Sequence, residues 1–196
     1  MQYNLSPEGH INKIVGECLA IVAIIRTTFT YLDVDIVKRI VESILRPKLE
    51  YAQVVWAPHL KKHIKKLERV QRAATKLVPE LQEMEYPERL KKMNLPTLEE
   101  RRRRGDMIQL YKCVKEIDEI DRDDFIVKET ERRTRGSHEM KLRLPISSTD
   151  TKKFSFPVRT LSAWNELPES IVRAKTIHSF KEKYDNWKQE NGTPRV

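Results

Sequence analysis

The sequence predicts a mostly α-helical protein, and three observations lead to this class. Apolar residues recur at spacings of three and four along several stretches, as one face of an amphipathic helix requires. Helix-capping residues precede most of these stretches. Hydrophobic residues make up 39% of the 196-residue chain, which is enough for a core and too much for a wholly disordered protein.

Two helices are expected at the N-terminal end. The first spans residues 7–29, with Ser6 as its N-cap and Pro7 in its first position. The second begins after Asp33, a good N-cap residue, and is expected to stop at Pro47 because proline has no amide hydrogen to continue the helical bonds. A short helix through residues 51–56 should follow.

The most distinctive stretch comes next, between His59 and Lys76, and reads as one amphipathic helix that ends before Pro79. It holds seven Lys or Arg and a single acid, Glu68, so few Glu–Lys pairs can neutralise its charge. The basic face of such a helix could simply be solvated, or it could bind a phosphate backbone or an acidic protein surface. Its apolar positions are Leu60, Ile64, Leu67, Val70, Ala74 and Leu77, and its basic positions are Lys61, Lys62, Lys65, Lys66, Arg69, Arg72 and Lys76.

Two further helices are expected before residue 116. Tyr86-Pro87 opens a short one, and Thr97 with Glu100 forms a capping box that opens a longer one. The longer helix carries Arg101, Arg102, Arg103 and Arg104. Since four consecutive residues span a full turn, these arginines cannot all face one way. The sequence leaves two alternatives for these arginines: full exposure to solvent, or local pairing with Glu99, Glu100 or Asp106.

The composition changes after residue 116, and three parts are predicted. Residues 1–116 form a helical domain, residues 117–152 an acidic and then basic linker or arm, and residues 153–196 a C-terminal helical segment. Within the arm, residues 141–144 alternate as a strand would, and residues 152–158 could pair with them in a small β-hairpin. The last helix begins after the N-cap residue Thr176 and presents Ile177, Phe180, Tyr184 and Trp187 on one face.

The net charge of +9 is concentrated in the middle of the chain. Residues 61–116 carry sixteen bases and nine acids, a net charge of +7, whereas residues 1–60 are neutral and residues 117–196 carry +2. A field of this sign favours polyanionic partners. The longest apolar run, residues 18–25, is too short to span a bilayer, so no membrane association is expected. An intracellular location is expected.

No catalytic or metal site is predicted. His59 and His63 have a metal-ligand spacing, but a third ligand is missing and neighbouring lysines would repel a cation. The adjacent aspartates Asp123 and Asp124 lie in a linker-like stretch, where solvation is the expected role. Cys18 and Cys113 are expected to be reduced core thiols, and no cofactor motif is present.

Several motifs, in order, resemble the region after the polymerase core in reverse transcriptases of non-LTR (LINE-type, jockey-like) retrotransposons. The clearest is ILRPKLEY at residues 44–51, followed by Val-Trp-Ala-Pro at residues 55–58. The resemblance runs from residue 10 to residue 187, and it departs where Ser137 separates Arg-Gly from His138. The other similar segments are 10–14, 67–74, 95–102, 104–106, 133–136, 154–159, 164–168 and 179–181.

The resemblance implies a helical thumb and the region beyond it, which grip the template and the nascent duplex. It also implies that the chain lacks the aspartate dyad, the nucleotide-binding segment and the endonuclease of the whole enzyme. The expected function is sequence-tolerant binding of RNA or an RNA–DNA duplex, without polymerase catalysis. Together with the charge pattern it selects as contacts Lys61, Lys62, Lys65, Lys66, Arg69, Arg72, Lys76, Arg101, Arg102, Arg103, Arg104, Arg132, Arg133 and Arg135.

Two other interpretations compete with nucleic-acid binding. The chain could be a co-opted protein-interaction module, using a surface that the missing palm once covered, or a gene remnant without a function of its own. For the module, Tyr51, Val55 and Trp56 would be anchors, although core packing is the expected role for each.

Overall fold

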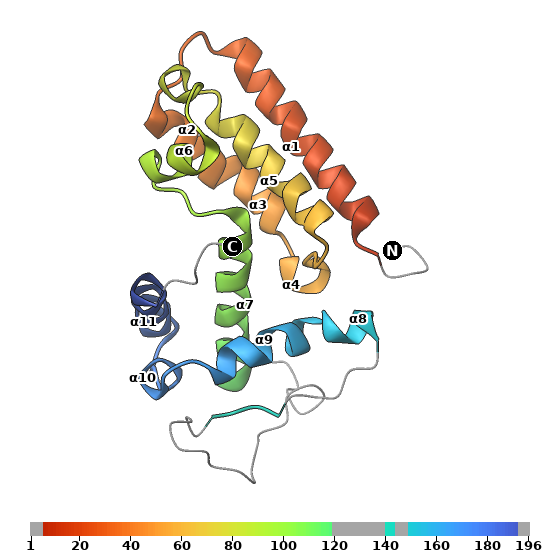
Figure 1. The fold of residues 1–196 in the computed structure, drawn as a ribbon, viewed down its shortest axis with the longest axis vertical. Helices are drawn as coiled ribbons and strands as arrows, with labels where there is room; N and C mark the ends of the chain where they lie inside the picture. The colour runs from red at the N-terminus through yellow and green to blue at the C-terminus, as the bar shows by residue number, and fades with distance from the viewer. Residues whose placement is uncertain (1–5, 119–139, 144–148, 192–196) are drawn as a thin grey trace. The chain divides into compact units, whose positions relative to one another are not determined.

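The computed structural model describes residues 6–118, 140–143 and 149–191, and within these ranges the protein is mostly helical and forms no sheet (Figure 1). The chain divides into two compact units, Met1–Arg103 and Arg104–Val196. This division falls inside one helix, α7, rather than near residue 116, where the composition changes.

The first unit contains most of the helices. In chain order they are α1 (Glu8–Thr28), α2 (Val34–Ile40), a π-helical segment η1 (Val41–Leu45), α3 (Arg46–Glu50), α4 (Gln53–Trp56), α5 (Lys61–Thr75), a 3₁₀ turn η2 (Pro79–Leu81), α6 (Tyr86–Lys92) and the start of α7 (Leu98–Val114). The second unit holds the rest of α7, then α8 (Asp150–Lys153), α9 (Phe156–Asn165), α10 (Glu169–Val172) and α11 (Ile177–Glu190).

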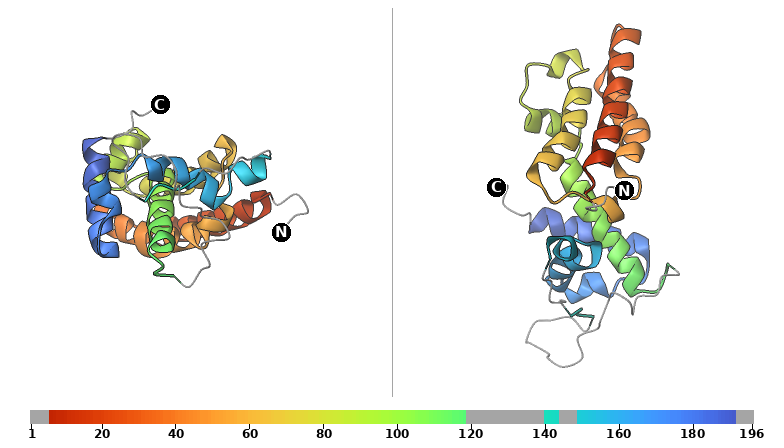
Figure 2. Two further views of the ribbon diagram at one scale, coloured as in Figure 1. Left: turned by 90° about the horizontal axis from the view of Figure 1, so that it is seen from below. Right: turned by 90° about the vertical axis from the view of Figure 1, so that its right-hand side faces the viewer.

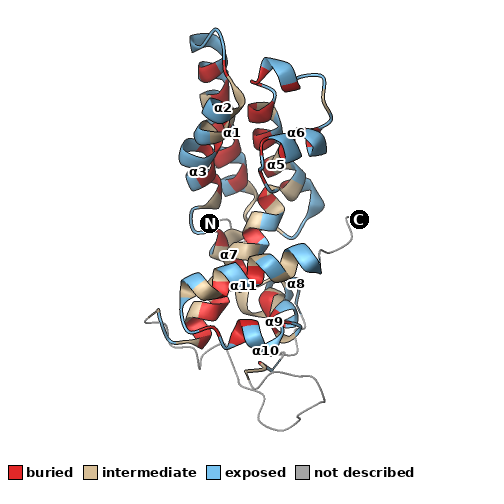
Figure 3. Ribbon diagram, turned by 90° about the vertical axis from the view of Figure 1, so that its left-hand side faces the viewer, coloured by how far each residue is buried: buried red, intermediate tan, exposed pale blue. Residues whose placement is uncertain are grey.

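The core of the first unit forms where α1 and α5 run side by side in the same direction (Figures 1 and 2). Buried and exposed positions alternate with the helical turn in these elements (Figure 3). Ile11 and Cys18 of α1 and Leu67 and Val70 of α5 are all fully buried. For α5 the amphipathic periodicity predicted the burial of Leu67, Val70, Ala74 and Leu77 correctly. It was wrong for Leu60, which precedes the helix as its N-cap residue and is 43% exposed.

The predicted helix starts are confirmed in large part. Asp33 Oδ1 accepts a hydrogen bond from the Ile36 amide at 2.7 Å. Thr97 and Glu100 exchange the two reciprocal bonds of a capping box, at 2.9 and 3.1 Å. Helix α1 begins one residue later than expected: Pro7 rather than Ser6 is its N-cap residue, and Ser6 Oγ accepts a hydrogen bond from the Glu8 amide at 3.3 Å.

The predicted stop at Pro47 is wrong. The chain passes from α2 through the π-helical turn η1 into α3, and Pro47 lies in the first turn of α3. A proline inside a continuous helix removes one amide donor, so the turn before it has to adjust. The π-helical turn, in which the Arg46 amide bonds to the Val41 carbonyl, resets the hydrogen-bond register just before the proline.

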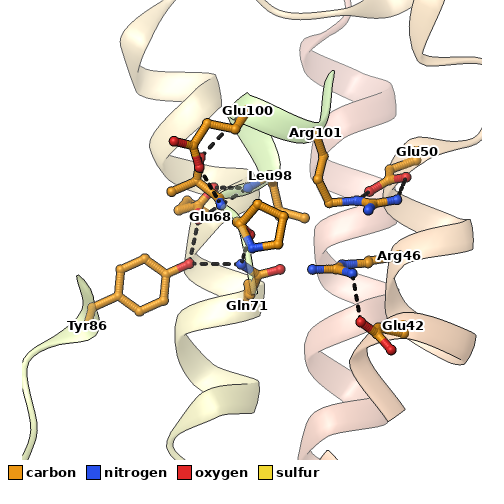
Figure 4. Close-up of polar contacts among 11 residues, drawn as sticks. Glu42, Arg46, Glu50, Glu68, Gln71, Tyr86, Leu98, Glu100 and Arg101 are labelled. Carbon is orange, nitrogen blue, oxygen red and sulfur yellow. Dashed lines mark hydrogen bonds and ion pairs between the residues drawn. The ribbon is translucent and has the colours of Figure 1, made fainter. Parts of the chain in front are cut away.

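A polar network anchored by Glu68 joins three helices of the first unit (Figure 4). The Glu68 carboxylate accepts hydrogen bonds from the Tyr86 hydroxyl of α6 and from the amide of Leu98, the first residue of α7, at 3.1 Å. One turn further along α5, the Gln71 amide donates to the Pro96 carbonyl at 3.0 Å and to the Tyr86 hydroxyl at 3.3 Å. Since a carboxylate at a helix N-terminus satisfies an unpaired amide and opposes the helix dipole, Glu68 fixes where α7 begins.

The second unit is built around aromatic side chains. The rings of Tyr111 and Phe180 stack with their centroids 4.3 Å apart, Trp164 and Phe180 are fully buried, and the Tyr111 hydroxyl donates to the Ala174 carbonyl at 2.8 Å. A paired ion bridge joins Arg159 to Asp106, with both nitrogen–oxygen distances 2.9 Å. Thr176 caps α11 as predicted.

The predicted β-hairpin is wrong for its second strand. Residues 152–158 lie in α8 and the start of α9, where Pro157 occupies the first turn of a helix. The backbone of Leu142 instead pairs with a side chain: the Leu142 amide donates to Asn165 Oδ1 at 3.0 Å, and Asn165 Nδ2 donates to the Leu142 carbonyl at 2.8 Å. An amide side chain thus takes the place of a neighbouring strand.

Two of the three residues expected in the core near residue 51 are instead on the surface. Tyr51 is 77% and Val55 71% exposed. Ala52 adopts a left-handed conformation (φ 50°) that starts a single-turn helix, and this turn directs Gln53 and Trp56 inward. The Trp56 ring packs against the core and the His10 ring, and its indole N–H donates to the Tyr51 carbonyl at 2.7 Å.

Replacing Glu68 should destabilise the first unit, by an amount that depends on how many hydrogen bonds the new side chain can still accept. Glu68→Ala leaves the Tyr86 hydroxyl and the Leu98 amide without their acceptor, and we expect a loss of roughly 2–3 kcal/mol. Glu68→Gln keeps one acceptor oxygen, and we expect a change of less than about 1 kcal/mol. Urea denaturation measures both, and equal stabilities of the two variants would contradict this role.

The same carboxylate should make stability depend on pH. Burial raises the pKa of Glu68, and this effect is larger than the lowering of the pKa by the hydrogen bonds from Tyr86 and Leu98. The folded state therefore binds this proton more tightly than the unfolded state, so the contribution to stability is present at low pH and is lost as the pH rises through the raised pKa. The unfolding free energy of the wild type relative to Glu68→Gln should therefore fall as the pH rises above the ordinary glutamate range, about pH 4. A constant difference would contradict the assignment.

Candidate nucleic-acid interface

Five basic residues form one stripe along α5 and its C-terminal end. At 100° per residue they fall within an arc of about 80°, and at 1.5 Å per residue they extend over about 22 Å. All five are exposed. We call this set the cationic stripe; it consists of Lys61, Lys65, Arg69, Arg72 and Lys76.

The stripe faces outward because the opposite side of α5 is packed into the core. Leu67, Val70 and Ala74 are fully buried and lie on the far side of the helix from the stripe. His63 is 3% exposed, also on the buried side. The hydrophobic periodicity therefore sets which bases face outward.

The single acid of α5 does not neutralise the stripe. Glu68 lies at its edge, but its carboxylate turns toward Tyr86 and the Leu98 amide. The sequence shows Glu68 as the single acid among these bases, but the charge count alone missed its structural role. As a result, the outer face of α5 presents only positive side chains.

Most side chains of the stripe are unengaged. Within the described parts of the chain, Lys61, Lys65, Arg69 and Lys76 form no ion pair and no side-chain hydrogen bond. The Arg72 guanidinium lies over the Tyr86 ring, 4.9 Å from its centroid, which orients it without neutralising it. These cations can therefore meet a ligand without first breaking a pair.

Two other basic residues of α5 serve its packing against α1. Lys62 Nζ lies 3.3 Å from the Glu8 carboxylate, and this contact lowers the pKa of Glu8. Lys66 Nζ donates to Asn12 Oδ1, one turn further along α1. The sequence pattern grouped Lys62 and Lys66 with the stripe, whereas the structure gives them partners on the neighbouring helix.

The four consecutive arginines of α7 diverge, as their spacing predicts. Arg101 makes a paired bridge to Glu50, Arg103 pairs with Glu99 at 2.7 Å, and Arg104 makes a paired bridge to Asp185. Arg102 is only 5% exposed. These arginines are engaged in intramolecular contacts, so we do not include them in the interface; Arg132, Arg133 and Arg135 lie outside the described residues.

The described residues show no arrangement suited to metal binding or thiol chemistry. No three His, Cys, Asp or Glu side chains among them are grouped as metal ligands would be. Cys18 and Cys113 are free and buried, as predicted, and burial raises the pKa of each thiol. Asp123 and Asp124 fall outside the described ranges.

Comparisons with protein-family models, with curated proteins and with solved structures find no match to this chain. In the described residues, no helix is long and apolar enough to cross a membrane. The resemblance to reverse transcriptases therefore rests on the sequence motifs alone.

The stripe should be dispensable for folding. The combined variant Lys61→Glu, Lys65→Glu, Arg69→Glu changes side chains that touch no described acid, so we expect its unfolding free energy to stay within about 0.5 kcal/mol of the wild type. Urea denaturation followed by circular dichroism measures this. A loss of several kcal/mol would mean that the stripe contributes to the fold.

Proposed function

We propose that this protein binds RNA or an RNA–DNA duplex through the cationic stripe of α5, without catalysing a reaction itself. The observation that carries the proposal is a row of exposed cations, four of which have no intramolecular partner among the described residues. The resemblance to the thumb region of reverse transcriptases supports the same ligand class.

The geometry of the stripe suits a phosphate backbone. Successive members lie three or four residues apart, which places a positive side chain about every 5–6 Å along the helix. Contacts of this kind neutralise phosphates and release their counterions, and they read no bases. Binding should therefore tolerate any sequence and weaken steeply with salt.

Charge reversal on the stripe tests the proposal directly. For the variant Lys61→Glu, Lys65→Glu, Arg69→Glu, we expect affinity for a blunt RNA–DNA duplex to fall at least tenfold at about 100 mM salt. Each lost phosphate contact should reduce the slope of log affinity against log salt by about 1. Fluorescence anisotropy across a salt series measures both quantities.

The control carries the same change in net charge away from the stripe. Lys13, Arg39 and Lys91 are exposed on α1, α2 and α6, and their replacement by glutamate should cause a smaller loss and a smaller change in slope. Equal losses in the two triple variants would show that only net charge matters. Unchanged affinity in the stripe variant would overturn the proposal.

A protein-interaction function is a second candidate, favoured by the exposure of Tyr51 and Val55. Large apolar side chains that are more than 70% exposed on one short turn are typical of a contact surface. Light scattering of the wild type and of the double variant Tyr51→Ala, Val55→Ala distinguishes the two functions. A wild type that is oligomeric and has no affinity for nucleic acid, together with a variant that is monomeric, would favour protein interaction.

A further inference from the structure

A hollow of about 500 Å³ opens in the first unit where α1 and α5 end. The C-terminal turn of α1 and the segment after it contribute Arg26, Phe29 and Thr30. Lys76, the C-cap residue of α5, also lines the hollow, and the segment directly after the 3₁₀ turn contributes Gln82 and Glu83. Its size lies in the range of pockets that take small ligands, about 300–1,000 Å³.

The hollow combines an aromatic ring with groups that could contact a base and a phosphate. Phe29 is 52% exposed although it is a large apolar residue. The Gln82 side chain bonds to no described residue, so its amide is available. The Glu80 carboxylate nearby is occupied, because it accepts a hydrogen bond from the Tyr31 hydroxyl at 3.2 Å.

The charges of the hollow are divided in a way that suits a nucleotide better than a free anion. Arg26 and Lys76 are both exposed, but each lies at a helix C-terminus, where carbonyl groups carry partial negative charge. Glu83 adds a full negative charge to the lining. The interior therefore favours a neutral ring with amino donors, and the two cations can contact the phosphate beside it.

From this arrangement we infer that the hollow binds one unpaired base at the end of a duplex held by the cationic stripe, with the base stacked on Phe29. Lys76 belongs both to the stripe and to the lining, so the stripe leads directly into the hollow. Aromatic platforms beside a cationic track are a general means of holding single-stranded nucleic acid. The inference rests on the proposed duplex binding and adds an unpaired extension to its substrate.

Three duplexes of identical sequence separate stacking from charge. One is blunt, one carries a short single-stranded adenine extension, and one carries an abasic extension with the same number of phosphates. We expect the adenine extension to bind roughly 5- to 100-fold more tightly than the abasic one, in keeping with the strength of base–aromatic stacking. Phe29→Ala should abolish that difference and leave the affinity for the blunt duplex unchanged.

Two further variants complete the test. Tyr51→Ala removes an aromatic ring that is more exposed than Phe29 and does not line the hollow, and it should retain the preference for the adenine extension. Glu83→Gln removes the negative charge while keeping an acceptor oxygen, and it should tighten the binding of both extensions.

The outcomes distinguish this inference from the function on which it rests. If the blunt duplex binds but adenine and abasic extensions bind equally, the hollow takes no base and the inference is overturned alone. The same conclusion follows if Phe29→Ala keeps the preference while remaining folded by circular dichroism. If the wild type binds none of the three duplexes at about 50 mM salt, both proposals fail.

Discussion

The first unit depends on one half-buried carboxylate. Glu68 is the only acid between His59 and Lys76, a stretch that holds seven bases, yet it forms no ion pair with them. Its oxygens instead accept bonds from Tyr86 and from the first amide of α7, so that one side chain holds α5, α6 and α7 together. Burial makes the charge costly, and the hydrogen bonds from two other helices offset part of that cost.

The same constraint defines the surface of α5. With Glu68 turned inward and the apolar face packed on the core, the angular position of each base decides its role. Lys62 and Lys66 point toward α1 and find partners on Glu8 and Asn12, whereas the stripe residues point away from the core. Neighbouring lysines of equal charge thus divide between packing and surface, because a helix turns 100° per residue.

In α7, by contrast with the stripe, the basic residues are engaged with carboxylates of the protein itself. Arg101 and Arg104 each form a paired bridge with a carboxylate far away in sequence, Glu50 and Asp185 respectively. The guanidinium fork matches a carboxylate in two parallel hydrogen bonds, and this geometry commits both groups. A cluster of arginines that looks like a phosphate-binding motif is here part of the scaffold of its own unit.

The amino-acid sequence alone specified the helical class, most helix starts and the amphipathic face of α5, because hydrophobic period and capping are local properties of the chain. It predicted the capping residues Asp33, Thr97 and Thr176 and the buried thiols. Tertiary structure decided which charges are neutralised, since the partners Glu50, Asp185 and Glu8 lie far from their arginines and lysine in sequence. It also decided that residues 152–158 are helical, because Phe-Ser-Phe-Pro-Val alternates like a strand while its proline suits a helix start, and only packing against a core selects between the two.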